Sequence, residues 1–579
     1  MFPAKLALIL IGLAWSLPFF SPVFREPIAS FYGEAAAFGL GLLAIACLLF
    51  PPLWSGIRIP RSGLMFLGFA LLMVLQIGLG RAVYPQLNLL GALYVLWAAV
   101  LAILAFRLRE LLGIETLVNW LCWFLVAGSL LSSVIGLVQL LGVKTSLAPL
   151  IVPQLHGRIY ANLGQANHLA GYLCLGIASV GYLFGSRRIS TWLAGAMLVP
   201  MLPVLAASGS RAVWLYAFAF LVLAAFLKWR RPGPESTRIL WFCVAIPAGL
   251  IFSLMLLQPF LPTLILPVET IGSNVQVKGL SSAVRLRFWE GGWLMFTSSP
   301  LLGVGFKQFA WNYFALTAHV PELTTEEGII DHAHNIVVQV GAEFGLAGLL
   351  ILLGGLAWWL WAMRRASAGA QLWWILAALW VLGLHSMLEY PLWYAYFLGI
   401  AAVLLGVAEP TALPVGNSRG GRVVMVAAVV LGVAAFSNVF RDYRTLQLMQ
   451  RPPVEAAPAG GSAVGTLLDL QGHSLFAPVI ELALARKMLL NTERLPDKVV
   501  LNGRVLRYLP TNDIAYRQPI LLALAGNREE MRVYWDMAAV NYPKDRNDAI
   551  GFLRQLAATE PNVKELLQYA EQSNQEQSK

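Results

Sequence analysis

Long apolar stretches separated by short polar segments occupy most of residues 1–440. An apolar helix needs roughly 20 residues to cross the hydrocarbon core of a bilayer, and the pattern predicts about thirteen such helices. They lie at residues 3–20, 33–54, 63–80, 87–106, 113–141, 167–185, 190–207, 211–228, 239–258, 335–362, 371–388, 392–408 and 422–440. The predicted fold class is therefore all-α, a polytopic helical membrane protein.

The positions of lysine and arginine predict how these helices are oriented. Short loops rich in Lys and Arg stay on the cytoplasmic side of a membrane. Alternate loops carry clustered basic residues, namely Arg58 with Arg61, Arg107 with Arg109, Arg187 with Arg188, Lys228 with Arg230 and Arg231, Arg364 with Arg365, and Arg419 with Arg422. All of these loops share one side if the N-terminus is cytoplasmic, so the C-terminus is predicted to lie outside.

Composition agrees with this prediction and excludes other classes of protein. Hydrophobic residues make up 58% of the chain and charged residues 12%, which is too apolar for a soluble domain. The net charge of +11 follows largely from the basic cytoplasmic loops, so we expect no nucleic-acid partner. Cys47, Cys122, Cys174 and Cys243 fall inside predicted spans without metal-ligand spacing, which predicts neither disulfides nor zinc.

Two regions outside the apolar spans are long enough to form structure on the outer side. The predicted parts of the chain are a membrane region at 1–258, a large outer loop at 259–334, a second membrane region at 335–440 and a soluble helical tail at 441–579. Pro452-Pro453 and the residues from Ala456 to Gly465 predict a flexible joint at the start of the tail.

Six helical patterns follow this joint. They lie at residues 477–490, 497–508, 513–525, 527–541, 547–559 and 562–572. The run from Leu521 through Gly526 to Trp535, Ala538 and Pro543 resembles one helical hairpin of the tetratricopeptide type. We therefore predict a small all-helical domain for the tail.

The junction between the large loop and the tenth span carries the first candidate chemistry. Asp331, His332, His334 and Asn335 lie together where polar sequence gives way to an apolar helix. The imidazole of His334 can take a proton from a hydroxyl near neutral pH. His334 is alternatively a structural hydrogen-bonding residue. A metal held by Asp331, His332 and His334 is disfavoured, because their spacing suits one ion poorly on a regular helix.

Three arginines on the predicted outer side form the second candidate group. Arg211 begins the eighth span, and Arg285 and Arg287 lie in the large loop. Positive charge outside runs against the orientation rule. Guanidinium groups bind phosphate with paired, charge-assisted hydrogen bonds. The alternative is that these side chains reach the membrane interface or pair with carboxylates.

Polar residues beside two further spans form the third group. Residues 158–168 include Gln165, Asn167 and His168, and their small and amide side chains predict a polar loop that lines a cavity. The outer turn at 385–394 includes Glu389 and Tyr390 and suits sugar binding. Aromatic residues there are alternatively ordinary membrane anchors. The chain has no phosphate-binding glycine loop with its lysine, so we expect a substrate that is already activated and no cofactor.

With these groups together, the chain resembles the bacterial O-antigen ligase and polymerase superfamily. The segment His334-Asn335, followed by Gly345-Leu346-Ala347-Gly348, resembles the ligase-type motif at the end of the large loop. Residues 164–168, residues 385–394 and the helical tail look more like the protein O-oligosaccharyltransferases, which include the pilin glycosylation ligases.

The resemblance implies transfer of a preassembled glycan, en bloc, from an undecaprenyl diphosphate carrier to Ser or Thr hydroxyls of a periplasmic protein such as a pilin. The enzyme would work in the lipid of the bacterial inner membrane, with its active site facing the periplasm and without metal or cofactor. His334 would activate the acceptor hydroxyl or organise it for attack, and Arg211 and Arg285 would neutralise the diphosphate. The residues expected to contact substrates are Gln165, Asn167, His168, Arg287, Asn335, Glu389 and Tyr390.

Other functions fit parts of the sequence. A ligase that transfers O-antigen to lipid A–core uses the same donor and chemistry, and a polymerase of O-antigen repeats is close to it. A transporter of lipid-linked solutes would place ionisable groups near the bilayer midplane and show internal repeats, neither of which the sequence predicts. A scaffold that recruits a partner through its tail leaves the His and Arg groups without a role.

Overall fold

The computed structural model describes residues 1–23, 27–28, 30–54, 57–153, 159–258, 282–325, 328–414, 419–449 and 463–577. Residues 259–281 of the predicted outer loop, Arg158 of the predicted polar loop and residues 450–462 of the predicted joint lie outside the described residues. Ala463 to Gly465, assigned to the joint from the sequence, instead begin a helix. Within these ranges all regular secondary structure is helical apart from one antiparallel pair of strands, β1 (Arg58–Ile59) and β2 (Leu413–Pro414).

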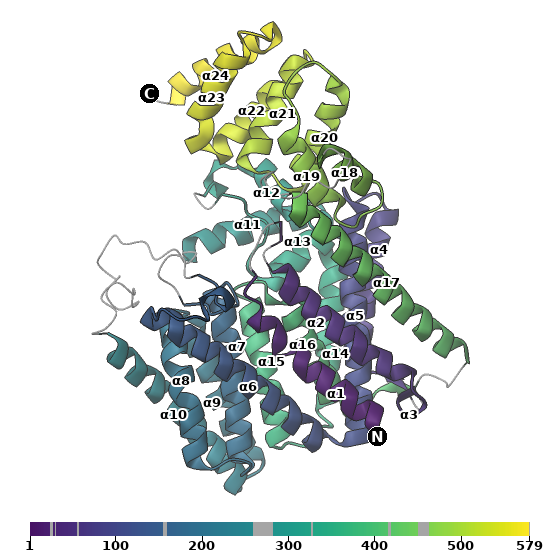
Figure 1. The fold of residues 1–579 in the computed structure, drawn as a ribbon, viewed down its shortest axis with the longest axis vertical. Coiled ribbons are helices and arrows are strands. Elements are labelled where there is room, and N and C mark those ends of the chain that lie inside the picture. Colours follow the sequence, from purple (N-terminus) through teal and green to yellow (C-terminus); the bar gives the residue numbers. More distant parts are fainter. Residues whose placement is uncertain are drawn as a thin grey trace. The chain divides into compact units, whose positions relative to one another are not determined.

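The helices follow one another along the chain (Figure 1). In the first half they are α1 Phe2–Ala14, α2 Phe31–Ala46, α3 Pro51–Trp54, α4 Arg61–Gly78, α5 Pro85–Leu112, α6 Ile114–Leu141, α7 Ala166–Gly185, α8 Thr191–Ala207, α9 Ala212–Arg230 and α10 Pro234–Leu257. Those up to the tail are α11 Ser282–Ser298, α12 Phe309–Thr317, α13 Ile336–Leu349, α14 Gly355–Met363, α15 Ala370–Ser386, α16 Ala395–Ala408 and α17 Arg419–Met449.

The tail holds α18 Ala463–Gln471, α19 Ala477–Lys487, α20 Leu495–Tyr508, α21 Asn512–Leu524, α22 Arg528–Asn541, α23 Arg546–Leu556 and α24 Lys564–Gln577. Short 3₁₀ turns are η1 Leu17–Phe20, η2 Cys47–Leu49, η3 Ala148–Leu150, η4 Pro321–Leu323, η6 Pro391–Trp393, η7 Pro543–Asp545 and η8 Pro561–Val563, and η5 Leu350–Gly354 is a π-helical turn.

Ten helical segments of the described residues are long and apolar enough to cross a membrane, and they coincide with ten of the predicted spans. The other three predicted spans correspond to the shorter apolar helices α8, α15 and α16. Large apolar side chains on these helices point outward, among them Trp192, Phe218, Trp241 and Phe252, each at least 66% exposed. Such a surface requires an apolar solvent. The chain is an all-α, multi-pass membrane protein, as the sequence predicts.

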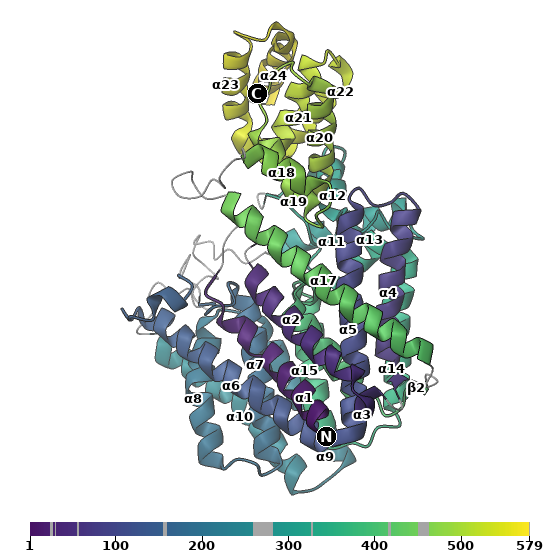
Figure 2. The ribbon, with the colours of Figure 1, turned by 45° about the vertical axis from the view of Figure 1, so that its right-hand side comes forward.

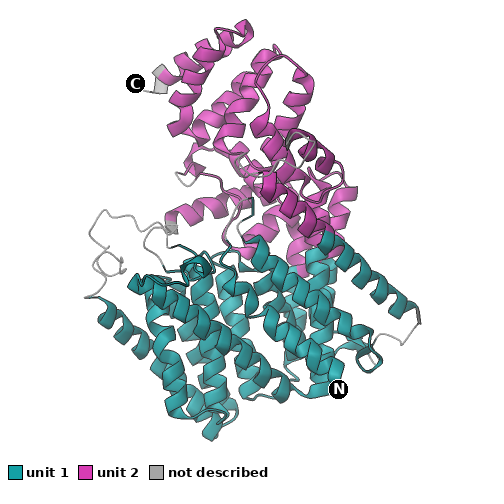
Figure 3. Ribbon diagram, viewed as in Figure 1, with its two compact units in different colours: residues 1–68, 93–279, 352–437 teal, residues 69–92, 280–351, 438–579 magenta. Residues whose placement is uncertain are grey.

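Contacts within the chain define two compact units (Figure 3). Unit 1 comprises residues 1–68, 93–279 and 352–437, and unit 2 comprises residues 69–92, 280–351 and 438–579. The division into four parts along the chain stays a prediction.

Helix α7 is one of the most enclosed spans of unit 1. It packs against α6, α8, α9, α10 and α15, and almost every side chain on it is buried. Glycine allows this close approach, because a Cβ at Gly176 would lie 2.2 Å from Ser129 Oγ and 2.7 Å from Met201 Cε. The rigid span fixes the polar residues at its first turn.

In unit 2 the tail helices α19 to α24 lie where the sequence pattern predicts them (Figure 2). Helices α21 and α22 form the predicted hairpin, with Gly526 at a φ of +75° in its turn. Trp535 is fully buried and meets Tyr516 edge-on, with ring centroids 5.2 Å apart. Helices α11 and α12, within the large loop, were not predicted.

Candidate functional site

His334 occupies a backbone conformation that few side chains adopt. Its φ is +51°, in the left-handed region, and it immediately precedes the cap of α13. Asn335 is that cap: its Oδ1 accepts hydrogen bonds from the backbone N–H groups of Val337 at 3.0 Å and Val338 at 3.2 Å. Asn is among the residues that cap helices best. Backbone strain of this kind is often found at functional sites.

The residue before His334 is held from both sides. The N–H of Ala333 donates to Gln339 Oε1 at 2.7 Å, and the carbonyl of Ala333 accepts from Trp289 Nε1 at 3.1 Å. Gln339 lies one turn into α13, and Trp289 lies on α11. Both polar groups of the Ala333 backbone are therefore satisfied by side chains, which fixes the position of His334.

Helix α11 presents one face toward this segment. The ring of Phe288 stacks with His334 at 6.0 Å between centroids. Gly292 approaches α13 so closely that a Cβ there would lie 2.4 Å from Val338 Cγ1. Arg285 is three and four residues before Phe288 and Trp289, so it lies on the same face of the helix. Arg285 therefore lies on the face of α11 from which Phe288 contacts His334.

A break in α13 locks the segment further. Gly345 has φ +62° and ψ −154°, and the turn of residues 300–305 fills the break. Leu346 N–H donates to the Pro300 carbonyl at 2.7 Å, and Gly305 N–H donates to the Glu343 carbonyl at 3.1 Å. The tenth span is therefore not the single regular helix that its apolar run suggests.

Gln76 on α4 ties this turn to α13. Its fully buried amide donates to the carbonyls of Leu302 at 3.0 Å and Glu343 at 2.8 Å, and its Oε1 accepts from Phe306 N–H at 3.1 Å. Nothing in the local sequence marks Gln76. Glu343 itself is 1% exposed, and an ionisable residue at membrane depth is a functional candidate by default.

The two ionisable side chains that precede His334, Asp331 and His332, differ in their protonation near neutral pH. Asp331 Oδ1 lies 3.0 Å from His332 Nδ1. Burial lowers the pKa of His332, although Asp331 opposes the shift. Desolvation would raise the pKa of Asp331, but His332 and Lys307 outweigh it and hold that pKa below its usual range. Near neutral pH, Asp331 is ionised and His332 is neutral. Within the described ranges, no three His, Cys, Asp or Glu side chains converge as metal ligands.

Unit 1 carries a second polar cluster, at the first turn of α7. The carboxylate of Glu389, which is 7% exposed, accepts hydrogen bonds from Asn167 Nδ2 at 2.8 Å and Gln165 Nε2 at 3.4 Å. His168 is buried and meets Tyr394 edge-on at 4.7 Å, and Tyr394 stacks with Tyr390 at 6.1 Å. The structure thus brings Gln165, Asn167, His168, Glu389 and Tyr390 into one cluster.

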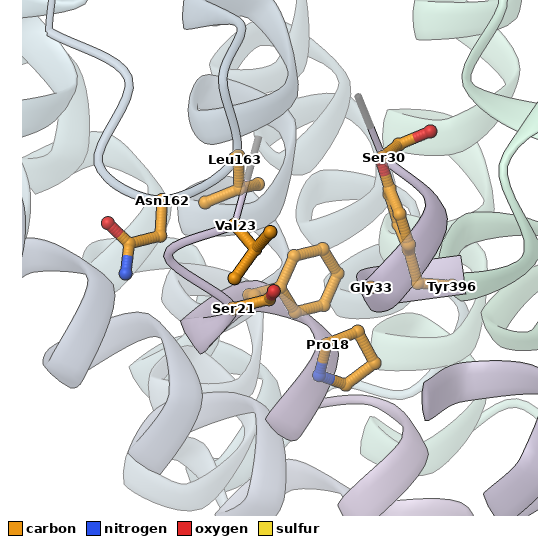
Figure 4. Close-up of a pocket in the computed structure, with 9 residues that line it drawn as sticks. Pro18, Ser21, Val23, Ser30, Gly33, Asn162, Leu163 and Tyr396 are labelled. Carbon is orange, nitrogen blue, oxygen red and sulfur yellow. The ribbon is translucent and has the colours of Figure 1, made fainter. Parts of the chain in front are cut away.

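The loop before α7 is pinned from α6 and borders a hollow. Gln139 Nε2 donates to the Val152 and Ala161 carbonyls at 2.9 and 3.0 Å. Asn162 Nδ2 donates to the Leu150 carbonyl at 2.8 Å. Figure 4 shows Asn162 and Leu163 across the hollow from Tyr396. These hydrogen bonds hold Val152, Ala161 and Asn162 in place.

The other two predicted arginines, Arg211 and Arg287, have different surroundings from those of Arg285. Arg211 is exposed at the start of α9, and its side chain forms no hydrogen bond or ion pair in the described part of the chain. Arg287 is exposed on another side of α11 from Arg285 and donates to the Thr324 carbonyl at 2.7 Å. Arg211 belongs to unit 1 and Arg285 to unit 2.

The fold and these clusters define a multi-pass membrane protein with polar sites at the ends of its spans. Known families match most of this chain: residues 196–353 match the family described as O-antigen ligase, residues 159–184 match protein glycosylation ligase, and residues 373–557 match virulence factor membrane-bound polymerase, C-terminal. The General O-oligosaccharyltransferase of Acinetobacter baylyi is 26% identical over 484 residues, or 80% of this chain and 80% of that protein. The resemblance is confirmed: the chain is related to the O-oligosaccharyltransferases of the O-antigen ligase superfamily.

Proposed function

We propose that this protein transfers a preassembled glycan from undecaprenyl diphosphate to Ser or Thr hydroxyls of a protein, such as a pilin, at the periplasmic face of the inner membrane. The observation that carries the proposal is the locked, left-handed His334 with Arg285 on the facing side of α11. A general base and a cation beside it are what attack by a hydroxyl on a diphosphate-linked sugar requires.

In the proposed reaction, the acceptor hydroxyl gives its proton to the imidazole of His334. Its oxygen then forms a bond to the anomeric carbon of the glycan. The bond from that carbon to the diphosphate oxygen breaks, and the electron pair leaves with the diphosphate. Arg285 stabilises this charge through its guanidinium donors. Because the donor is already activated, no nucleotide is required.

Other predicted residues keep proposed roles. Arg211 is proposed to neutralise the diphosphate of the donor, as the resemblance implies. Glu389 with Gln165 and Asn167 offers carboxylate and amide groups for sugar hydroxyls, and Tyr390 with Tyr394 offers stacked rings. For Arg287 and Asn335, the observed hydrogen bonds favour structural roles in α11 and α13. We therefore propose that they support the site.

The test is glycan transfer in a bacterium that makes a lipid-linked glycan and expresses a candidate pilin. His334→Asn removes the imidazole, while Asn still tolerates the left-handed backbone. Arg285→Ala removes the guanidinium. His319→Ala is the matched control, because His319 is exposed in the same loop. We expect a glycan-dependent mass shift on the pilin with the wild-type protein and the control, and its loss in both site variants at equal membrane abundance. Full activity of His334→Asn would exclude a general-base role.

A second candidate function is transfer to lipid A–core, and the match of residues 196–353 to the O-antigen ligase family favours it. The same cells distinguish the two functions. Glycan on lipid A–core, with none on the pilin, would replace the proposed protein acceptor with a lipid.

A further inference from the structure

Helix α12 has two apolar faces that pack into different cores of unit 2. Its first face carries Trp311, Phe314, Ala315 and Ala318, at the i, i+3, i+4 and i+7 spacing of one helical stripe. These four side chains pack into the apolar core of the tail, and α12 contacts both α20 and α22. The tail core is therefore completed by a helix from the large loop.

The second face of α12 packs toward the candidate site. Phe309 and Tyr313 share an apolar core with Phe288 and Ala333. The ring of Tyr313 meets Phe288 edge-on at 5.8 Å, and Phe288 also stacks with His334 at 6.0 Å. A continuous packed path thus runs from the tail core through α12 to the imidazole.

A polar contact fixes α12 to the tail. Asn541, the last residue of α22, donates from Nδ2 to the Phe314 carbonyl at 3.1 Å and to Thr317 Oγ1 at 2.7 Å. The Phe314 carbonyl also accepts from Thr317 Oγ1 at 2.7 Å, so Asn541 joins a small polar group at the C-terminal end of α12. Tyr542 adds a ring contact with Phe314 at 6.2 Å.

A second contact anchors the tail away from α12. Tyr84, between α4 and α5, donates its hydroxyl to Glu481 Oε2 at 2.6 Å. Glu481 is 3% exposed and also accepts from Arg504 Nε at 2.7 Å. A buried, fully bonded carboxylate of this kind strongly favours one geometry. The Tyr84 contact holds the tail, and the Asn541 contact holds α12 to the tail, so α12 has little freedom to move.

We infer that the tail positions the catalytic segment through α12, and that Asn541 is a positioning residue for His334. This inference rests on the proposed function for its kinetic consequence only. A tail that merely recruited an acceptor would have no reason to share its core with the helix behind Phe288. Small displacements of a general base lower the rate of transfer strongly, because the reaction depends on geometry.

The experiment compares Asn541→Ala with Asn562→Ala in the purified full-length protein. Asn562 donates a hydrogen bond within the tail, to the Leu524 carbonyl at 3.4 Å, so it is the matched control. Thr317→Val removes the hydroxyl that Asn541 bonds, and Thr317→Ser keeps it. The readouts are hydrogen exchange of residues 328–340 and glycan transfer from the undecaprenyl diphosphate donor to a candidate pilin and to a short Ser-containing peptide from it.

We expect Asn541→Ala and Thr317→Val to speed exchange of residues 328–340 and to lower kcat about tenfold for both acceptors, with little change in KM. Asn562→Ala and Thr317→Ser should match the wild-type protein. A rise in KM for the pilin alone, with kcat unchanged, would overturn the inference in favour of recruitment. Unchanged exchange in both variants would overturn it too, whether or not the protein transfers glycan, so this readout separates its failure from that of the proposed function.

Discussion

Gln339 accepts, through Oε1, a 2.7 Å hydrogen bond from the backbone N–H of Ala333, and this contact links the first turn of α13 to the residue before His334. Both groups are buried. The side chain reaches back over six residues, so it constrains the turn in a way that no neighbouring backbone group does.

We expect Gln339→Leu to lower transfer activity without abolishing folding. Leucine has a similar volume but cannot accept the bond, and an unsatisfied buried N–H costs about 1–3 kcal/mol. The check is glycan transfer together with thermal unfolding in detergent. Wild-type activity in this variant would mean that Trp289 alone suffices to hold Ala333.

Gly345→Ala should reduce the amount of folded protein. A Cβ there would lie 2.6 Å from the carbonyl carbon of Leu301, and its backbone region is open almost only to glycine, at a cost of about 1–3 kcal/mol. Gly354→Ala is the control, because a Cβ at Gly354 meets nothing within 4 Å. Membrane abundance and the unfolding temperature measure both. Equal stability of the two variants would contradict the proposed constraint.

The folded protein should become less stable as the pH decreases below about 6.5, the usual pKa of histidine, and His332 should account for part of that loss. Burial lowers the pKa of His332 in the folded protein, so the unfolded chain binds its proton first as the pH drops. The contribution of His332 to stability is complete above its pKa in the unfolded chain. It is lost as the pH falls from that value toward the lower pKa of His332 in the folded protein. Unfolding temperatures of the wild-type protein and His332→Gln, measured from pH 7.5 to 5, should converge. Parallel curves would assign the effect to other groups.

The Asn167 and Glu389 pair should show coupling in a double-mutant cycle. Asn167→Asp places a carboxylate against the Glu389 carboxylate, 2.8 Å from the present amide nitrogen, and should lower activity. Adding Glu389→Gln restores the pair with its roles exchanged, because Gln at position 389 can then donate to Asp at position 167. We expect the double variant to recover activity, with a coupling energy of about 1–2 kcal/mol. Additive losses would show that the contact itself does not matter.

Local patterns explain how much of the fold could be predicted. Apolar runs identify the spans because the bilayer acts on each helix separately, and the polar-to-apolar change at His334 identifies the start of α13. The three short spans α8, α15 and α16 follow from the same runs. Arg285 was predicted from its charge on the predicted outer side, and it lies on the face of α11 that also carries Phe288 and Trp289.

Contacts between distant segments explain what could not be predicted. The glycines from Gly345 belong to the motif recognised in the sequence, but no local pattern states that they meet the turn at residues 300–305. Gln76 lies at the end of an ordinary span and gains its role from bonds to residues more than two hundred positions away. Helices α11 and α12 have mixed sequences, and their apolar faces become recognisable only beside the cores that they complete.

The break at Gly345 has a consequence for how the protein enters its membrane. Lipid offers no partners for backbone N–H groups, so a spanning helix normally completes its own hydrogen bonds before lipid surrounds it. This span does not: Leu346 and Ala347 donate instead to the carbonyls of Pro300 and Leu301. Residues 336–363 therefore reach their final hydrogen bonding only with the turn at residues 300–305 in place. Completion of this span inside the membrane and folding of that turn depend on each other.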